Sequence, residues 1–230
     1  RTLARLKWCN EIILVDDFST DNTVEISESF GCKVFRRNFD GFGTQKQFAV
    51  EQASNNWILN IDADEVLSDE LIVEVQNTLK NPQCDGYDIP VTHVFLGKIF
   101  KHGRESKYYH LRLFNKISGT FDAALVHEKV ILSGNTGKLK GVILHYSYKD
   151  LDHYFEKFNR YTSSGAQKLF QKNKKRSLFL IIASFPFYFI KHYFIYRNFM
   201  NGTAGFTWSY LNAWYHVIKY LKLKELNNKI

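Results

Sequence analysis

The feature that most constrains this chain is a short apolar run that ends in a cluster of carboxylates. Residues 57–61 are apolar except for one asparagine, a pattern typical of a buried strand. Asp62, Asp64 and Glu65 follow directly. Carboxylates at the carboxyl end of a parallel strand lie where open α/β sheets bind their ligands. Negative charges this close repel one another unless a cation joins them, and Mg²⁺ uses carboxylates together with substrate phosphates. The stretch therefore predicts a metal–diphosphate site.

The alternative is an acidic loop that leads into a helix, because Asp and Glu are favoured at helix N-termini. The size of the chain allows either. Its 230 residues suffice for one large domain, or for one domain with an appendage, and 45% of them are apolar. Its three cysteines are too few and too scattered for a disulfide framework or a zinc site, so a reducing compartment is expected.

Net charge divides the chain in two. Residues 1–149 hold 18 Lys and Arg against 19 Asp and Glu, whereas residues 150–230 hold 13 against 4. The second part also carries 20 of the 37 aromatic residues. We therefore expect a near-neutral domain at 1–149 and a basic, aromatic extension at 150–230, each with its own task.

Strands and helices alternate through the first part. Apolar runs predict strands at 12–15, 33–35 and 57–61. Helices are expected over about 22–30, 44–53 and 68–79. Asn22 and Glu25 have the spacing of a capping box at the first of these helices. The alternation predicts an α/β fold with a parallel, helix-covered sheet. Short β segments follow at 87–95, 111–114, 126–132 and 142–146.

The last part of the chain reads as helical. One helix is expected at 151–171, and residues 178–190 are apolar except for one serine and one proline. These 13 residues fall short of the roughly 20 that span a bilayer. A final helix carries a stripe at helical spacing, with Lys219, Lys222 and Lys224 at its end: Phe206, Tyr210, Trp214, Val217 and Leu221. Such stripes are usually core. With this charge the stripe also fits a helix in the membrane interface, where each cation gains about 1 kcal/mol near anionic lipid.

Several motifs resemble glycosyltransferase family 2. Residues 15–23 read Val-Asp-Asp-Phe-Ser-Thr-Asp-Asn-Thr and residues 62–65 read Asp-Ala-Asp-Glu, with a glycine-containing segment at 41–49 between them. Later pieces are similar to bacterial enzymes identified as lipopolysaccharide inner-core β-1,4-glucosyltransferases: residues 112–114, 126–128, 145–148 and 202–206. The resemblance covers nearly the whole chain. It implies a GT-A catalytic domain at 1–149, a Rossmann-like mixed sheet that binds nucleotide sugars, with a helical, membrane-associating extension.

Family members open with a strand that ends in a Thr/Tyr-Asn-Glu loop and helps to hold the nucleotide base. This sequence begins with Arg1, inside the helix that follows that strand in the family, and its only methionine is Met200. The resemblance therefore implies that the family's first strand is missing here. A chain without it is expected to be poorly stable or inactive unless another segment fills the gap.

The resemblance also implies roles at the nucleotide. Asp17, or else Asp16, would contact the uracil or ribose of the donor, against the alternative of a solvated turn. Asp62 would bind the ribose side or a metal-bound water, and Asp64 the metal itself. A divalent ion suits this chemistry because it neutralises charge that develops on the departing nucleoside diphosphate. Glu65 is expected beside the site or as a helix-start charge.

Four more residues are candidates. His145 follows an apolar strand, where histidine is usually a core group, but related enzymes use a late histidine as a metal ligand. Imidazole beside carboxylate favours Mn²⁺ over Mg²⁺. Glu128 is expected as the general base for the acceptor hydroxyl, unless it is an exposed strand carboxylate. Lys46 and Arg112 would contact the diphosphate, Arg112 through a bidentate fork, or else are surface charges.

Together these features predict an inverting, metal-dependent glycosyltransferase that moves a hexose, glucose from UDP-glucose in the first instance, to a lipid-linked glycan such as the lipopolysaccharide inner core. It would work as a peripheral protein on the inner face of the bacterial cytoplasmic membrane, against anionic lipid. Rival acceptors are capsular or teichoic glycans and polyprenyl phosphate. A rival class is a non-catalytic module that binds membrane or nucleic acid through the basic tail. No stacking or groove-reading motif is present, so no nucleic-acid partner is expected.

Overall fold

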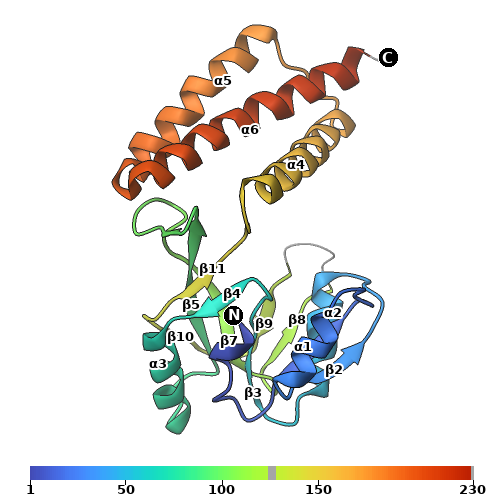
Figure 1. The fold of residues 1–230 in the computed structure, drawn as a ribbon, viewed down its shortest axis with the longest axis vertical. Coiled ribbons are helices and arrows are strands. Elements are labelled where there is room, and N and C mark those ends of the chain that lie inside the picture. The colour runs from blue at the N-terminus through green and yellow to red at the C-terminus, as the bar shows by residue number, and fades with distance from the viewer. Residues whose placement is uncertain (124–127, 229–230) are drawn as a thin grey trace. The chain divides into compact units, whose positions relative to one another are not determined.

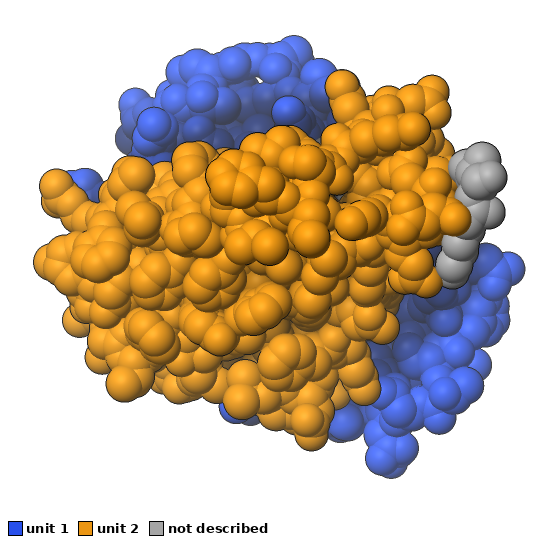
Figure 2. All heavy atoms as spheres, turned by 90° about the horizontal axis from the view of Figure 1, so that it is seen from above, with its two compact units in different colours: residues 1–91, 109–145 blue, residues 92–108, 146–230 orange. Residues whose placement is uncertain are grey.

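The computed structural model describes residues 1–123 and 128–228, and it divides into two compact units. Unit 1 comprises residues 1–91 and 109–145, and unit 2 comprises residues 92–108 and 146–230. Figure 2 colours unit 1 blue and unit 2 orange. The division predicted at residues 149 and 150 differs from this one chiefly because residues 92–108 belong with the C-terminal helices.

The described strands form three sheets: a parallel pair, an antiparallel pair and a larger sheet. β1 (Ile13–Asp16) pairs in parallel with β2 (Lys33–Arg36), and β8 (Gly119–Phe121) pairs antiparallel with β9 (Val130–Leu132). The larger sheet has seven strands in the order β3-β7-β5-β11-β4, with β6 and β10 also paired to β5. Its members are β3 (Trp57–Leu59), β4 (Glu65–Leu67), β5 (Gly86–Phe95), β6 (Lys98–Ile99), β7 (Tyr108–Asn115), β10 (Thr136–Lys138) and β11 (Ile143–His145).

The large sheet is mixed. β3 runs antiparallel to β7, with Leu59 opposite Leu113, so the expectation that the strand before the carboxylates is parallel is wrong. β4 is antiparallel to β11, whereas β10 is parallel to β5. The predicted α/β fold with a mixed sheet of the GT-A kind is confirmed. The proposal that a first strand is missing from this sheet stays a prediction.

Helices pack around the strands of unit 1 (Figure 1): α1 (Thr23–Ser29), α2 (Phe42–Gln52) and α3 (Asp69–Lys80). Ser68 caps α3 by accepting a hydrogen bond from Leu71 N. The predicted capping box at α1 is wrong, because Asn22 makes no side-chain cap hydrogen bond. The first residues form a 3-10 turn, η1 (Leu3–Arg5), rather than the end of an amphipathic helix.

The core of unit 1 lies between the large sheet and α3. Ile89 and Ile143 from the sheet are fully buried, and so are Leu71 and Val75 from α3. Full burial of side chains of this size is worth about 1.5–3 kcal/mol each. The close packing of α3 against the chain at residue 141 requires glycine there, because a Cβ on Gly141 would lie 2.4 Å from Leu71 Cα. This packing fixes β4, the strand that follows the acidic loop, and its partner β11.

Unit 2 is helical: α4 (Leu151–Gln171), α5 (Leu178–Ile190), a π-helical turn η2 (Lys191–Ile195), a 3-10 turn η3 (Asn198–Asn201) and α6 (Gly202–Asn228). The predicted bounds of α4 and α5 are confirmed. Both helices begin at a side-chain cap, since Asp150 accepts from His153 N and Ser177 from Leu180 N. α6 packs against both α4 and α5.

A buried asparagine explains why residues 92–108 belong to unit 2. Asn201 Oδ1 accepts hydrogen bonds from the backbone N–H groups of Lys101 and His102, at 3.0 and 3.2 Å. Its amide nitrogen donates to His102 O at 2.8 Å. Nearby, a Cβ on Gly205 would lie 1.9 Å from the Asn198 carbonyl oxygen, so the start of α6 requires glycine there. These contacts join a loop and a helix start that are distant in sequence.

One segment among the described residues, Leu178–Ile195, is long and apolar enough to cross a membrane by length and composition. It has a mean hydropathy of 1.6 over 18 residues, and 11% of it is buried. It exceeds the 13 apolar residues expected because η2 continues α5 beyond Ile190. A single segment of this kind is weak support for a span, since core helices and signal sequences meet the same criterion.

Candidate active site

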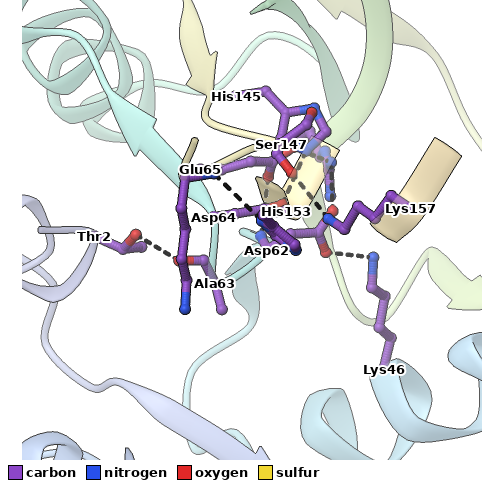
Figure 3. Close-up of polar contacts among 12 residues, drawn as sticks. Thr2, Lys46, Asp62, Ala63, Asp64, Glu65, His145, Ser147, His153 and Lys157 are labelled. Atoms are coloured by element: carbon purple, nitrogen blue, oxygen red, sulfur yellow. Dashed lines mark hydrogen bonds and ion pairs between the residues drawn. The ribbon is translucent and has the colours of Figure 1, made fainter. Parts of the chain in front are cut away.

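The acidic loop lies between β3 and β4, where two reciprocal hydrogen bonds close it. Asp62 N donates to Glu65 Oε2 at 2.9 Å, and Glu65 N donates to Asp62 O at 3.0 Å. The N-terminal segment braces the loop from outside, because Thr2 Oγ1 donates to Ala63 O at 2.9 Å (Figure 3). The loop therefore has a defined shape before any ligand binds.

Glu65 is a structural anchor for this loop. It is 1% exposed and accepts a hydrogen bond from Arg112 Nη2 at 2.5 Å. Burial raises the pKa of Glu65, although the guanidinium of Arg112 acts against that rise. Glu65 is thus neither a helix-start charge nor exposed: it is the first residue of β4. Removing one partner of such a buried pair would leave an uncompensated charge, at a cost of about 3–5 kcal/mol.

Asp62 sits between two cations. Lys46 Nζ lies 2.7 Å from its Oδ1, and Arg112 Nη2 lies 3.0 Å from its Oδ2. Burial opposes ionisation of Asp62, but the charges of Arg112 and Lys46 outweigh it and lower its pKa to about 2. Figure 3 shows Lys46 reaching from its helix toward Asp62. Lys46 and Arg112, expected at a diphosphate or on the surface, are instead partners of carboxylates in this structure.

Lys46 also binds Glu128. Its Nζ lies 2.7 Å from Glu128 Oε1, so one ammonium group bridges Glu128 and Asp62. The side chains of Lys46 and Glu128 are 17% and 16% exposed, which shields this pair from water. Glu128 is therefore not a freely exposed strand carboxylate. Residues 124–127, which include His127 of the same motif, lie outside the described residues.

Asp64 pairs with His145 instead. The β4–β11 register places His145 opposite Glu65, and His145 Nε2 lies 3.2 Å from Asp64 Oδ2. Burial acts against both charged forms, but their hydrogen bond prevails: it lowers the pKa of Asp64 and raises the pKa of His145. Each of the two is therefore stabilised in its charged form by the other.

The donor set for a metal is correspondingly small. Across residues 1–123 and 128–228, no group of three or more His, Cys, Asp or Glu side chains is arranged to hold a metal ion. Asp64 and His145 offer one carboxylate and one imidazole, a pair that suits a transition metal such as Mn²⁺. Asp62, expected as a further ligand, has both oxygens engaged by cations. Two ligands match a metal that also takes phosphate oxygens.

Asp16 and Asp17, expected at the nucleoside, are held by backbone amides. Asp16 is 3% exposed, and its Oδ2 accepts from Ser19 N at 3.0 Å. Asp17 is exposed, and its Oδ1 accepts from Phe39 N at 3.0 Å. Asp16 therefore shapes the turn after β1, and Asp17 joins that turn to residue 39. Of the two, Asp17 is the one that a ligand can reach.

One residue near the charges was missed by the sequence reasoning. His110 lies two residues before Arg112 on β7, and alternation along a strand puts both on one face. Burial and the charge of Arg112 lower the pKa of His110. The alternation of His110 with Arg112 along the strand could have indicated it. The predicted strand began at residue 111, however, one position too late to include His110.

The chain is similar in sequence and in structure to known proteins. The profile of Glycosyl transferase family 2 matches residues 7–131. An uncharacterized glycosyltransferase of Rickettsia typhi is 32% identical over 234 residues, covering 96% of this chain and 80% of the relative. The lipopolysaccharide core biosynthesis glycosyltransferase LpsC of Rhizobium meliloti is 28% identical over 233 residues, covering 98% and 86%. Among solved structures, S. aureus TarS 1-349 aligns with 100% of this chain and 87% of its own, at 15% identity and a TM-score of 0.44. By its profile match and its Rickettsia relative, this chain belongs to glycosyl transferase family 2 and is a transferase enzyme.

Proposed function

We propose that this chain is an inverting, metal-dependent glycosyltransferase that moves a hexose, glucose from UDP-glucose in the first instance, to a lipid-linked glycan such as the lipopolysaccharide inner core. The observation that carries the proposal is the double ion pair of Lys46 with Asp62 and Glu128. It joins the candidate general base to the acidic loop that would face the donor. Support for the acceptor class comes from LpsC, whose name assigns it to lipopolysaccharide core biosynthesis.

Glu128 is the proposed catalytic base. Its carboxylate takes the proton of the acceptor hydroxyl while that oxygen forms a bond to the anomeric carbon of the sugar. The bond from that carbon to the diphosphate oxygen breaks, and the nucleoside diphosphate leaves with the bonding electrons. A positioned general base contributes about 10²–10⁴ in rate. Lys46 holds the Glu128 carboxylate in place through the 2.7 Å contact.

Asp64 and His145 are the proposed protein ligands of the metal, with Asp62 beside them toward the ribose. When bound, a divalent ion neutralises the charge that develops on the departing diphosphate. Asp62 could join the metal ligands only by giving up Lys46 or Arg112, since each holds one of its oxygens. Asp62 is for this reason our weaker metal ligand. Its negative charge serves better to keep the two cations in position.

The two cations suit different tasks. Lys46 has a flexible side chain and three N–H donors, so it can turn from Asp62 to a diphosphate oxygen while it keeps its contact with Glu128. Arg112 is 8% exposed, and it is held by Glu65 and Asp62, so it is better suited to fix the acidic loop than to contact the donor. At the nucleoside we propose Asp17, with Asp16 as the alternative, because Asp17 is the exposed one of the pair.

Replacement of Asp64 by alanine is the decisive test. Asp64→Ala should reduce transfer from UDP-glucose below detection and leave the fold intact, with a small fall in melting temperature from the lost hydrogen bond to His145. The control is Glu70→Ala, which removes an exposed carboxylate from α3 and should keep full activity. Chelation of the wild type should have the same effect as Asp64→Ala, and Mn²⁺ should reverse it. Full activity of Asp64→Ala would overturn the metal assignment.

The donor and acceptor need a matrix of assays. UDP-glucose, UDP-galactose and UDP-N-acetylglucosamine would each be offered with truncated lipopolysaccharide, polyprenyl phosphate, or capsular and teichoic precursors. Transfer of glucose to truncated lipopolysaccharide, with inverted anomeric configuration, is the expected result. Transfer to polyprenyl phosphate alone would replace the acceptor and leave the rest of the proposal intact. We also propose that the enzyme is peripheral on the inner face of the cytoplasmic membrane, where a lipid-linked acceptor would be presented.

A further inference from the structure

We propose that α5, together with part of α6, forms a face that enters one leaflet of an anionic bilayer without crossing it. The inference rests on the proposed function, because a lipid-linked acceptor is what brings this enzyme to a membrane. It goes further by naming the element that inserts, its depth, and the cations that select the lipid. All of the residues concerned belong to unit 2.

An unusually apolar surface covers the outer side of α5 and η2. Phe179 is 77% exposed and Ile182 is 63% exposed. We call this surface the apolar face, and it consists of large side chains that are each half exposed or more: Phe179, Ile182, Phe187, Ile190, Phe194 and Ile195. The opposite side of α5 packs against the rest of unit 2, since Ile181 and Ser184 are buried. A contiguous apolar patch of this size on a protein surface marks an interaction site.

The aromatic stripe of α6 extends the apolar face. Phe206, Tyr210 and Trp214 are each more than a third exposed, whereas Val217 of the same predicted stripe is buried in the core. Ring contacts join the stripe to α5: the Phe185 and Trp214 centroids are 5.4 Å apart, and those of Phe189 and Phe206 are 5.8 Å apart. Amphipathic aromatic side chains such as Tyr and Trp favour the boundary between lipid chains and headgroups.

The charges around the apolar face favour an anionic membrane as its partner. Residues 157–224 contain no Asp or Glu, so no acidic side chain of this stretch opposes binding to anionic lipid. Exposed cations stand directly before α5: Lys172, Lys174, Lys175 and Arg176. Arg197 is exposed just beyond the other end, after η2. Cations around an apolar surface are the pattern of an amphipathic element on an anionic membrane, and a protein partner would not require a face so free of acids.

One lysine of α6 that the sequence suggested for this task, Lys222, is used differently. Lys222 Nζ donates to Asn159 Oδ1 at 2.6 Å and to the hydroxyl oxygens of Thr162 and Ser163 at 2.8 Å each. These acceptors lie on α4, so Lys222 joins two helices of unit 2. The exposed cations next to the apolar face, before α5 and at Arg197, are therefore better candidates for contact with lipid headgroups than Lys222 is.

The packing of the helices in unit 2 limits how deeply α5 can enter the bilayer. Figure 1 shows α6 between α5 and α4, and Ile181 of α5 shares a cluster with Ala166 of α4. If α5 crossed the bilayer, α4 would have to cross beside it. The exposed Arg160 and Lys168 of α4 would then enter hydrocarbon, at about 2.5–3.5 kcal/mol for each charge at the centre. Entry of the apolar face alone leaves α4 in water and avoids this cost.

Vesicle flotation tests the face. The full chain should bind vesicles that contain phosphatidylglycerol and bind pure phosphatidylcholine weakly. Ile182→Glu should weaken binding about tenfold or more, because it loses the burial of a large apolar side chain. The matched control is Ile117→Glu, which changes an isoleucine that is 75% exposed in unit 1 and should bind as the wild type does. Equal binding of Ile182→Glu and the wild type would overturn the inference.

Two further arms separate this inference from the proposed function. Asp64→Ala should float with vesicles as well as the wild type, since flotation needs no catalysis. If Ile182→Glu binds normally while transfer persists, the apolar face is wrong and the enzyme assignment stands. Replacement of Lys174 and Lys175 by glutamine should weaken binding to phosphatidylglycerol and reduce its salt dependence. Unchanged salt dependence would remove these cations from the proposal.

The fluorescence of Trp214 can measure how deeply the apolar face enters the bilayer. It packs on Phe185, which lies near the middle of the Leu178–Ile195 segment, so a spanning segment would place Trp214 at the bilayer centre. Lipids brominated near the headgroup should quench its fluorescence more than lipids brominated near the chain ends. Trp214→Phe supplies the background from the other tryptophans. Stronger quenching by the chain-end label would show a spanning segment and overturn the one-leaflet placement.

Discussion

Lys46 serves two carboxylates with one ammonium group, which makes it the centre of the candidate site. Both contacts measure 2.7 Å, and the lysine side chain is 17% exposed. Shielding from water strengthens such contacts, because the attraction between charges rises as the effective dielectric falls. The same lysine can release Asp62 to bind a diphosphate oxygen and keep Glu128, because an ammonium group has three donors. Position and charge at one residue thus govern the proposed base and the proposed donor site.

Lys46→Met should therefore lower kcat by about 10²–10³, the effect of removing a preorganised charge. The variant keeps the length and apolar stem of the side chain but leaves the shielded Glu128 carboxylate without its cation, so the melting temperature should also fall. The matched control is Lys80→Met at the end of α3, which should keep wild-type kinetics. Steady-state assays against UDP-glucose measure both. A rise in KM with kcat unchanged would show that Lys46 binds the donor without positioning Glu128.

The sequence suggested candidate residues for the site more readily than it suggested their partners in the structure. Asp62, Asp64 and His145 could be named because motif and chemistry point the same way. The pairing of Lys46 with Glu128 could not, because the two are far apart in sequence and only the fold brings them together. The burial of Glu65 could not be predicted for a similar reason. Its burial depends on Arg112, which arrives from another strand.

At the scale of elements, long helices were predicted closely and short strands were not. α4 and α5 match their predicted bounds because a cap residue, Asp150 or Ser177, precedes a clear pattern. β4 was missed because its three residues follow the carboxylates without a turn signal. The direction of β3 was wrong because an apolar run is the same in parallel and antiparallel sheets. Pairing is set by tertiary contacts that no local pattern contains.

Glu11 joins three elements of unit 1, and its effect on stability should depend on pH. Its carboxylate contacts Lys33 Nζ at 2.5 Å and accepts from Ser54 N at 2.8 Å. It thereby links the start of β1 to β2 and to the chain after α2. The hydrogen bond from Lys33 comes first among the causes, followed by that from Ser54, and together they lower the pKa of Glu11 to about 2.

Glu11→Gln should reduce the free energy of unfolding at pH 7 by about 1.5–3 kcal/mol, the range for hydrogen bonds to a charged group. A lowered pKa in the folded state stabilises above the unfolded value of 4.5 and ceases to do so as the pH falls toward 2. The gap between wild type and variant should therefore narrow across that window in urea titrations. Glu28→Gln, an exposed change on α1, should show a constant and small gap. A gap for Glu11→Gln that stays constant with pH would contradict the assignment.

At the scale of the whole molecule, the charge asymmetry in the sequence did anticipate a separate helical part. It could not anticipate that residues 92–108 would join it. That segment is carried there by hydrogen bonds from the amides of Lys101 and His102 to Asn201, far along the chain. The sequence also placed the candidate cations for membrane contact on α6, whereas Lys222 of α6 bonds to α4 and a group of exposed cations precedes α5. Composition indicates that a surface exists, and packing decides where it lies.

Ligand binding to the whole chain supplies the last prediction. Thermal unfolding would be followed with UDP, with Mn²⁺ and with both together. A ligand that binds the native state alone stabilises it by RT ln(1 + [L]/Kd), about 2.7 kcal/mol at a hundredfold excess over Kd. Because Asp64 and His145 offer two ligands and the diphosphate would offer more, the shift with both should exceed the sum of the separate shifts. Asp64→Ala should lose this excess and keep the shift with UDP alone. An additive result for the wild type would mean that metal and nucleotide bind independently, which would contradict a joint metal–diphosphate site.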